Sequence, residues 1–259
     1  MRKLITSLLI IALQHGCCFT KSQTISQDIL SQKMEMITDS IEAFVSIDDY
    51  EKVFSICKNG INFLSQNNCF TTPATCDLCL LAGESSMKLK NYQNAQTYFC
   101  QSFILDELGK FGVGAYSTIL NYADSDTSIC SFKNLIELAK TDTVYLNMLA
   151  KDPAKLSDML NVTAWNYINN GNFIYAIKYF KSETSLLEIL GQKGDDKYLS
   201  IIPCIIFCLK ELHDFDLATI QADNFVELAK QYKGQKSIAY AKALQTRADV
   251  EDEFGNGEK

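Results

Sequence analysis

Four short stretches of the chain share one pattern, an aromatic residue three positions before a small apolar residue: Tyr50-Glu51-Lys52-Val53, Tyr92-Gln93-Asn94-Ala95, Phe173-Ile174-Tyr175-Ala176 and Phe215-Asp216-Leu217-Ala218. The first two stretches are 42 residues apart, and so are the last two. The second and third are 81 residues apart, close to two periods, so we expect one degenerate repeat between them. A fixed period of this length is typical of proteins built from stacked structural repeats.

Small and apolar residues recur at fixed offsets around each stretch and predict two helices per repeat. The offsets place apolar side chains on one face of two successive helices, with the aromatic residue at the turn between them. Asn, Asp and Gly in the connecting segments are typical of helix ends and helix caps. Each repeat is therefore predicted to be a helical hairpin and the fold to be all-α. Twelve residues before the small residue stand Ile41, Gly83, Ala164 and Ile206, and four residues after it stand Cys57, Phe99, Phe180 and Ala222.

Stacking of these hairpins explains why several are needed. One hairpin cannot bury both of its faces, whereas neighbours in a stack bury a continuous core. Small residues such as Gly83 and Ala164 allow helices to approach closely, and the aromatic residues fill the space beside them. We expect about five hairpins in a single array over residues 23–259, with the segment 111–159 degenerate.

The repeat resembles the tetratricopeptide repeat. That family has a small residue in its first helix, an aromatic residue near the turn, Ala in the second helix and an aromatic residue four positions later, as in Gly83, Tyr92, Ala95 and Phe99. The 42-residue period is similar to the longer-helix subclass found in kinesin light chains and before bacterial CHAT-type peptidase domains. The match covers roughly residues 33–259, and Val53, Cys57 and Ala222 depart from it. The resemblance implies a right-handed α-solenoid whose first helices line a concave face.

The end of the chain leaves two interpretations open. A further 42-residue step from Ala218 falls one position beyond Lys259, and the residues from Phe254 onwards read as a turn. We therefore expect an N-terminal portion of a longer protein whose last hairpin is truncated. The alternative is a polar terminal helix that caps the stack, as repeat arrays require.

The start of the chain predicts a signal peptide over residues 1–22. Arg2 and Lys3 precede an apolar stretch from Leu4 to Leu13, which is short for a membrane-spanning helix. We place cleavage after Ser22, which predicts a secreted or periplasmic protein with no membrane span in the mature chain. Lipid attachment at Cys17 is the less favoured alternative, because the preceding Gln14-His15-Gly16 matches that signal poorly.

Charge and composition exclude several classes of function. The formal net charge is -7, and removal of Arg2, Lys3 and Lys21 would bring it to about -10. Nucleic acid is therefore not an expected partner, because its binding depends largely on Lys and Arg at phosphates, and Arg247 would be the single remaining arginine. His213 would be the single remaining histidine, which disfavours sites built on imidazole.

The chain carries no pattern that predicts catalysis, a cofactor or a metal. Cys76 and Cys79 form one CxxC pair, but a zinc site needs two more ligands and no second pair follows. We expect these cysteines to be buried core residues; a disulfide from Cys69 to either of them is the alternative in an exported chain. His213 lies at a predicted turn without an evident Cys or Ser partner, so we expect no enzyme activity.

A concave surface of repeats can bind a partner, and we expect a protein or peptide there. Trp165 is the leading candidate because it follows the packing residue Ala164 and so leaves the core stripe. A packing role for Trp165 is an equal alternative. The predicted function is an exported scaffold that binds through this face, or alternatively a regulatory or substrate-recruiting N-terminal arm of a larger protein such as a CHAT-type peptidase. The candidate groove residues are Glu84, Lys88, Asn161, Trp165, Asn169, Phe207, Lys210, Gln245, Asp249 and Asp252.

Overall fold

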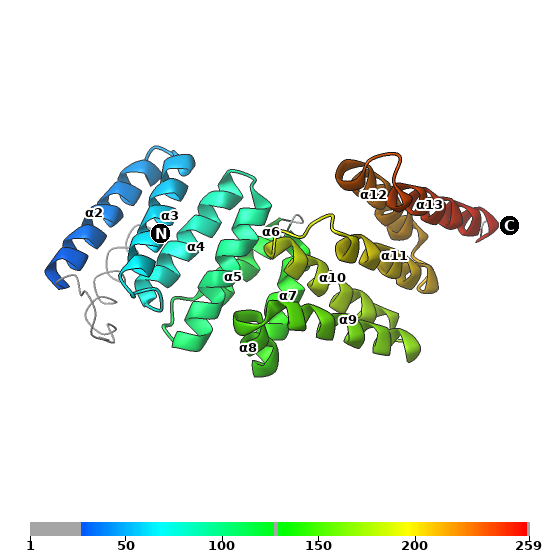
Figure 1. Ribbon diagram of the computed structural model, residues 1–259, viewed down its shortest axis with the longest axis horizontal. Coiled ribbons are helices and arrows are strands. Elements are labelled where there is room, and N and C mark those ends of the chain that lie inside the picture. Colours follow the sequence, from blue (N-terminus) through cyan, green and yellow to red (C-terminus); the bar gives the residue numbers. More distant parts are fainter. Residues whose placement is uncertain (1–26, 127–128, 258–259) are drawn as a thin grey trace. The chain divides into compact units, whose positions relative to one another are not determined.

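The computed structural model describes residues 27–126 and 129–257 (Figure 1). In this part of the chain all regular secondary structure is helical and no strand occurs. The expected signal peptide, residues 1–22, lies outside the described residues. The helices are α2 (Gln27–Val45), α3 (Tyr50–Gln66), α4 (Pro73–Lys88), α5 (Tyr92–Gly109), α6 (Ala115–Ser125), α7 (Cys130–Thr141), α8 (Thr143–Lys151), α9 (Pro153–Asn169), α10 (Phe173–Ile189), α11 (Asp196–Glu211), α12 (Phe215–Lys233) and α13 (Ile238–Gly257).

The predicted helical hairpins are present, and consecutive helices pack against one another. The chain divides into two compact units that meet between residues 136 and 137. In the first unit α2 packs on α3, α3 on α4, and α4 on α5; in the second α9 packs on α10, α10 on α11, and so on to α13. None of the described helices is both long and apolar enough to cross a membrane.

All four repeated turns have the same backbone geometry. The residue two positions before the repeat aromatic lies in the left-handed region, with φ of 56° at Asp48, 56° at Lys90, 70° at Gly171 and 57° at His213. The next residue donates its backbone N–H to a carbonyl five residues earlier, as from Asp214 to Leu209 at 3.0 Å. In three turns this residue also caps the second helix with its side chain. The four aromatic–small stretches in the sequence therefore each follow a turn of the same conformation.

The small repeat residues are buried as the pattern predicts, and so are the aromatic residues four positions after them. Ala95, Ala176 and Ala218 are fully buried, and so are Phe99 and Phe180. The contact between Gly83 and Phe99 is so close that a methyl group built on Gly83 would overlap the Phe99 ring. Close approach of α4 and α5 therefore depends on the absence of a side chain at position 83.

Substitution of Gly83 by Ala tests this contact by the sign of its effect. Ala in place of Gly within a helix normally stabilises it by about 0.5–1 kcal/mol. Here we expect a loss of about 1–3 kcal/mol in the free energy of unfolding, because the Phe99 ring has no room to move. Urea unfolding measures the change. Leu in place of Phe99 should offset part of the loss in the double variant; a stabilised single variant would contradict the contact.

Two details of the structure differ from the sequence prediction. One degenerate hairpin was expected between the second and third stretches, but α6, α7 and α8 lie there, three helices of 11, 12 and 9 residues. Caps such as Asp142, which accepts from the backbone N–H of Val144 at 2.7 Å, divide this segment into shorter helices. A turn was expected from Phe254 onwards, but α13 continues to Gly257 as one helix of 20 residues. The Gly and Asn residues there extend a helix end instead of reversing the chain.

The link from α5 to α6 is fixed by one carboxylate. Asp106, which is buried, accepts hydrogen bonds from the backbone N–H groups of Val113, Gly114 and Ala115 at 3.0, 2.9 and 3.0 Å. These are the first free donors at the start of α6, and Gly114 itself makes no side-chain cap. The link is therefore held by a residue of the preceding helix.

Candidate functional site

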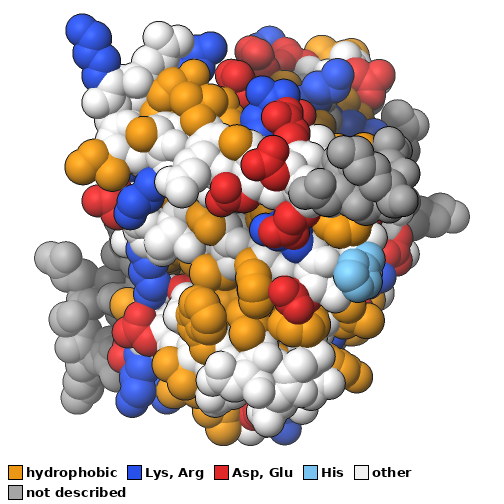
Figure 2. All heavy atoms as spheres, turned by 90° about the vertical axis from the view of Figure 1, so that its right-hand side faces the viewer, with side chains coloured by type: hydrophobic (Ala, Val, Ile, Leu, Met, Phe, Trp, Pro, Cys, Tyr) orange, Lys and Arg blue, Asp and Glu red, His pale blue; other side chains and the backbone are white. Residues whose placement is uncertain are grey.

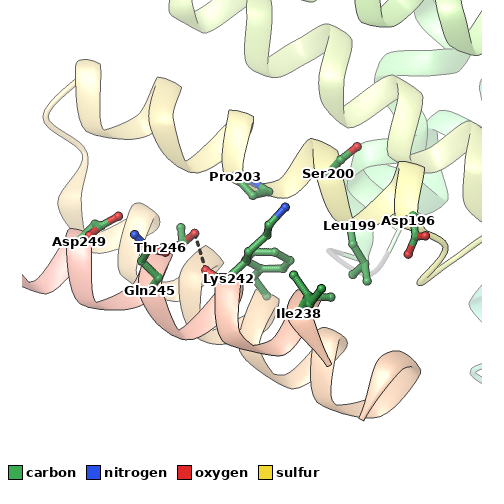
Figure 3. A pocket seen from close by; sticks show the side chains of 11 residues that line it. Asp196, Leu199, Ser200, Pro203, Ile238, Lys242, Gln245, Thr246 and Asp249 are labelled. Carbon is green, nitrogen blue, oxygen red and sulfur yellow. Dashed lines mark hydrogen bonds between the residues drawn. The ribbon is translucent and has the colours of Figure 1, made fainter. Parts of the chain in front are cut away.

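A groove of about 640 Å³ lies between α11 and α13 in the second unit (Figure 3). Both helices are the first helix of a predicted repeat, and α12 packs against each of them. The volume is in the range of small-molecule and peptide sites. The groove is lined by Asp196, Leu199, Ser200, Pro203, Phe225, Ile238, Ala239, Lys242, Gln245, Thr246 and Asp249.

One part of the groove is apolar. Leu199 and Phe225 are buried, whereas Ile238 keeps 78% of its surface exposed. Pro203 lies inside α11 and has no N–H, so the helix lacks the bond that residue 203 would donate to the carbonyl oxygen of Leu199. The apolar part therefore consists of the exposed Ile238 side chain and the partly buried Pro203 ring, beside two buried residues.

The polar residues of the groove follow one face of α13. Lys242, Gln245 and Asp249 are three and four residues apart, the spacing that aligns side chains along a helix. Figure 3 shows the Lys242 side chain directed toward α11, near Pro203 and Ser200, with Gln245 and Asp249 at the other end. Between them, the Thr246 hydroxyl donates to the Lys242 carbonyl at 3.0 Å.

The charges in the groove are not all available to a ligand. Asp196 forms an ion pair with Lys233 at 2.7 Å, and the hydrogen bond from Lys233 lowers the pKa of its carboxyl group. Within the part of the chain that the structure describes, Lys242 and Asp249 form no ion pair. One cation and one anion are therefore free along the α13 wall.

Two of the predicted groove residues, Gln245 and Asp249, line this groove, and two others on α11 do not. Phe207 is 42% exposed and contacts Phe173 edge-on, with ring centroids 6.1 Å apart. Lys210 forms an ion pair with Glu253 of α13 at 2.6 Å. Asp252 is exposed on α13 but lies outside the lining. Lys210 therefore joins the two helices that form the groove.

The predicted residues of α9 are partly engaged in packing. Trp165 is 44% exposed and contacts the buried Phe180 edge-on, with centroids 6.1 Å apart. Part of the Trp165 side chain therefore packs against Phe180, and part of it is exposed and could contact a partner. The Asn161 amide donates to Glu183 at 2.8 Å, and Asn169 is exposed near the end of the helix. None of the three lines the groove.

Sequence reasoning missed a buried carboxylate beside Asn161. Glu183 is fully buried on α10 and accepts hydrogen bonds from Asn161 and, at 3.0 Å, from Ser157. Lys197 of α11 lies 3.7 Å from Glu183, and burial raises the pKa of this carboxyl group. The spacing of Glu183 after Ala176 and Phe180, on the buried stripe of α10, is the signal that would have revealed it. The network ties three helices together.

Glu84 and Lys88 belong to α4 in the first unit and do not line the groove. Glu84 is half-buried and shares a hydrogen bond with the Tyr122 hydroxyl, and burial raises the pKa of its carboxyl group. Lys88 is exposed in the last turn of α4. Glu84 therefore contributes to packing within its own unit.

The groove residues that the sequence did not suggest are chiefly Lys242, Thr246 and Ile238 on α13, with Ser200 and Pro203 on α11. Lys242 continues the spacing of Gln245 and Asp249 by one more turn, so the stripe could have been extended toward the start of α13. Hydrophobic side chains are visible between acidic ones on the side of the molecule where α13 ends (Figure 2). An apolar residue such as Ile238 gives no signal by its sequence position alone.

Most of the cysteines whose side chains the structure describes are core residues. Cys57, Cys76, Cys79, Cys100 and Cys208 are buried, and burial raises the pKa of Cys79 to about 12. No disulfide joins Cys69 to Cys76 or Cys79, because both of those thiols are unbridged; the Cys69 thiol donates to the Asn67 carbonyl oxygen at 3.4 Å. No group of three or more His, Cys, Asp or Glu side chains in the described ranges is arranged to hold a metal ion.

Comparison with known proteins gave no relative: no family model matches the chain, and no curated protein matches it.

Proposed function

We propose that this chain is an exported helical-repeat scaffold that binds a peptide or protein segment in the groove between α11 and α13. The hairpins would stack as a right-handed solenoid of the tetratricopeptide kind, with the first helices on the concave face. Catalysis has no part in the proposal. Binding would place the partner along α13, between its polar stripe and the apolar residues of α11.

The observation that supports this proposal best is the composition of the groove. It combines an apolar part at Leu199 and Ile238 with polar groups that converge on the same space. Ligand sites in proteins are mostly concave and apolar with a few placed polar groups.

Selection from a random peptide library on the full-length chain tests the proposal. Ser200 is exposed on the groove wall, so Trp in its place should fill the groove and lower the affinity of selected peptides about tenfold or more. Asn224→Trp is the matched control, because Asn224 is exposed on α12 outside the lining. Selection of no peptide, or equal affinity for the Ser200→Trp and control variants, would remove the groove as the binding site.

The same selection examines Trp165 and the alternative role as a recruiting arm. A Trp165→Ala variant that loses the selected peptides would extend the site from the groove to α9. A recruiting arm of a larger protein would use the same binding step, so the groove variants are informative for both roles.

A further inference from the structure

We infer that the groove selects a peptide carrying an acidic side chain and, three residues away, a basic side chain, held in polyproline II conformation. This inference rests on the proposed function and names the partner chemistry for the same site. The acidic side chain would contact Lys242 and the basic one Asp249.

The charges around the groove differ in whether they already have a partner. Neighbouring charges are already paired: Lys210 with Glu253 at 2.6 Å, Arg247 with Asp223 at 2.7 Å, and Lys233 with Asp196 at 2.7 Å. In the described part of the chain Lys242 and Asp249 have no such partner, and both line the groove. Complementary charges steer a partner and fix its register, and like charges exclude others. The groove therefore favours a ligand with one negative and one positive group.

The spacing of the two charged residues along α13 limits the conformation of the ligand. Lys242 and Asp249 are seven residues apart on one helix, which corresponds to about 10.5 Å along its axis. In a polyproline II peptide, side chains three residues apart lie on the same face, about 9.3 Å from one another. In a β-strand, same-face side chains are about 6.8 Å apart for two residues and about 13.6 Å for four. Of these two extended conformations, polyproline II has the spacing closer to that of Lys242 and Asp249.

An apolar surface lies beside the two charged residues of the groove. Pro203, Leu199 and Ile238 form the apolar part of the groove, and the Lys242 side chain extends toward Pro203 in Figure 3. A peptide in polyproline II conformation can place apolar residues against these side chains and has already lost much of its conformational freedom. The two residues between the charged positions are therefore expected to be proline or another apolar residue.

Fluorescence anisotropy with the full-length chain and three labelled peptides tests the inference. The matched peptide is Pro-Glu-Pro-Leu-Lys-Pro, and the two others carry Glu at both charged positions or Lys at both. We expect the wild-type chain to bind the matched peptide about tenfold more tightly than either other peptide. Lys242→Glu should shift the preference to the peptide with two lysines, and Asp249→Lys to the peptide with two glutamates.

The controls are charge reversals on exposed neighbours that do not line the groove, Lys236→Glu and Asp252→Lys. Both should keep the wild-type order of the three peptides. The inference is overturned if the three peptides bind wild type equally, if none binds, or if the control variants reorder them as strongly. If the library selection still yields groove-dependent peptides without this charge spacing, the proposed function stands and only the partner chemistry is wrong.

Discussion

An Ala176→Arg variant should lose cooperative melting. Ala176 is fully buried on α10, in a core that also contains Ala164, Phe180 and Ile206. A guanidinium group at this position would be buried without a partner. Burying an unpaired charge costs more free energy than most single substitutions do. We expect a loss of more than about 4–5 kcal/mol in the free energy of unfolding, a large part of the total stability of an ordinary domain. Thermal melting followed by far-UV circular dichroism measures it.

The neighbouring residue supplies the control for this substitution. Tyr175 is 56% exposed, and its ring stacks on Tyr167 with centroids 5.3 Å apart. Tyr175→Arg therefore adds the same charge to the same helix and removes one aromatic contact, at a cost of about 1 kcal/mol. If the Ala176→Arg variant melts like wild type, position 176 is not the buried small position of the repeat, and the repeat register is wrong.

An Asp77→Asn variant should be more stable than wild type at pH 8 and equally stable near pH 4. Asp77 lies on α4, and one of its carboxyl oxygens is buried without a hydrogen bond to any of the residues that the structure describes. Burial raises the pKa of this carboxyl group to about 7, and the nearby Asp106 adds to the shift. Because the folded state binds this proton more tightly than the unfolded chain, stability decreases as the pH rises from about 4 to about 7. Asn, which cannot ionise, should remove this decrease of roughly 2–4 kcal/mol.

Urea unfolding at a series of pH values between these limits measures the effect. Asp39→Asn is the control, because Asp39 is exposed on α2. The control should leave the pH dependence of wild type unchanged. Parallel curves for wild type and Asp77→Asn would show that Asp77 is ionised without penalty at neutral pH.

The repeated hairpins could be predicted from the sequence because their signals are local and repeated. Ala95, Ala176 and Ala218 mark one buried position of the second helix, and each stands three residues after an aromatic that follows a turn. The period shows which turn belongs to which helix pair. The 42-residue period fails between Gly109 and Pro153, where capping residues determine the helix ends. The number of helices in this segment could therefore not be predicted from the period.

The groove was predicted only in part because its lining comes from three helices. Gln245 and Asp249 were found by their position on a first helix, whereas Pro203 and Ile238 acquire their role from the distance between α11 and α13. Asn161 was read as a groove residue because its position is polar and off the core stripe. Its actual partner, Glu183, lies 22 residues further on, and single-helix patterns do not reveal such pairs.

The common turn geometry has a consequence for how such a chain can change over time. Asp48, Lys90, Gly171 and His213 are chemically unrelated, yet each holds the same left-handed conformation between its two helices. The direction of the second helix is therefore set by the backbone and not by one conserved side chain. A gene that gains or loses one whole period would keep the turn of each remaining hairpin intact, so hairpins can be added by duplication or removed by deletion while the sequence of each turn drifts.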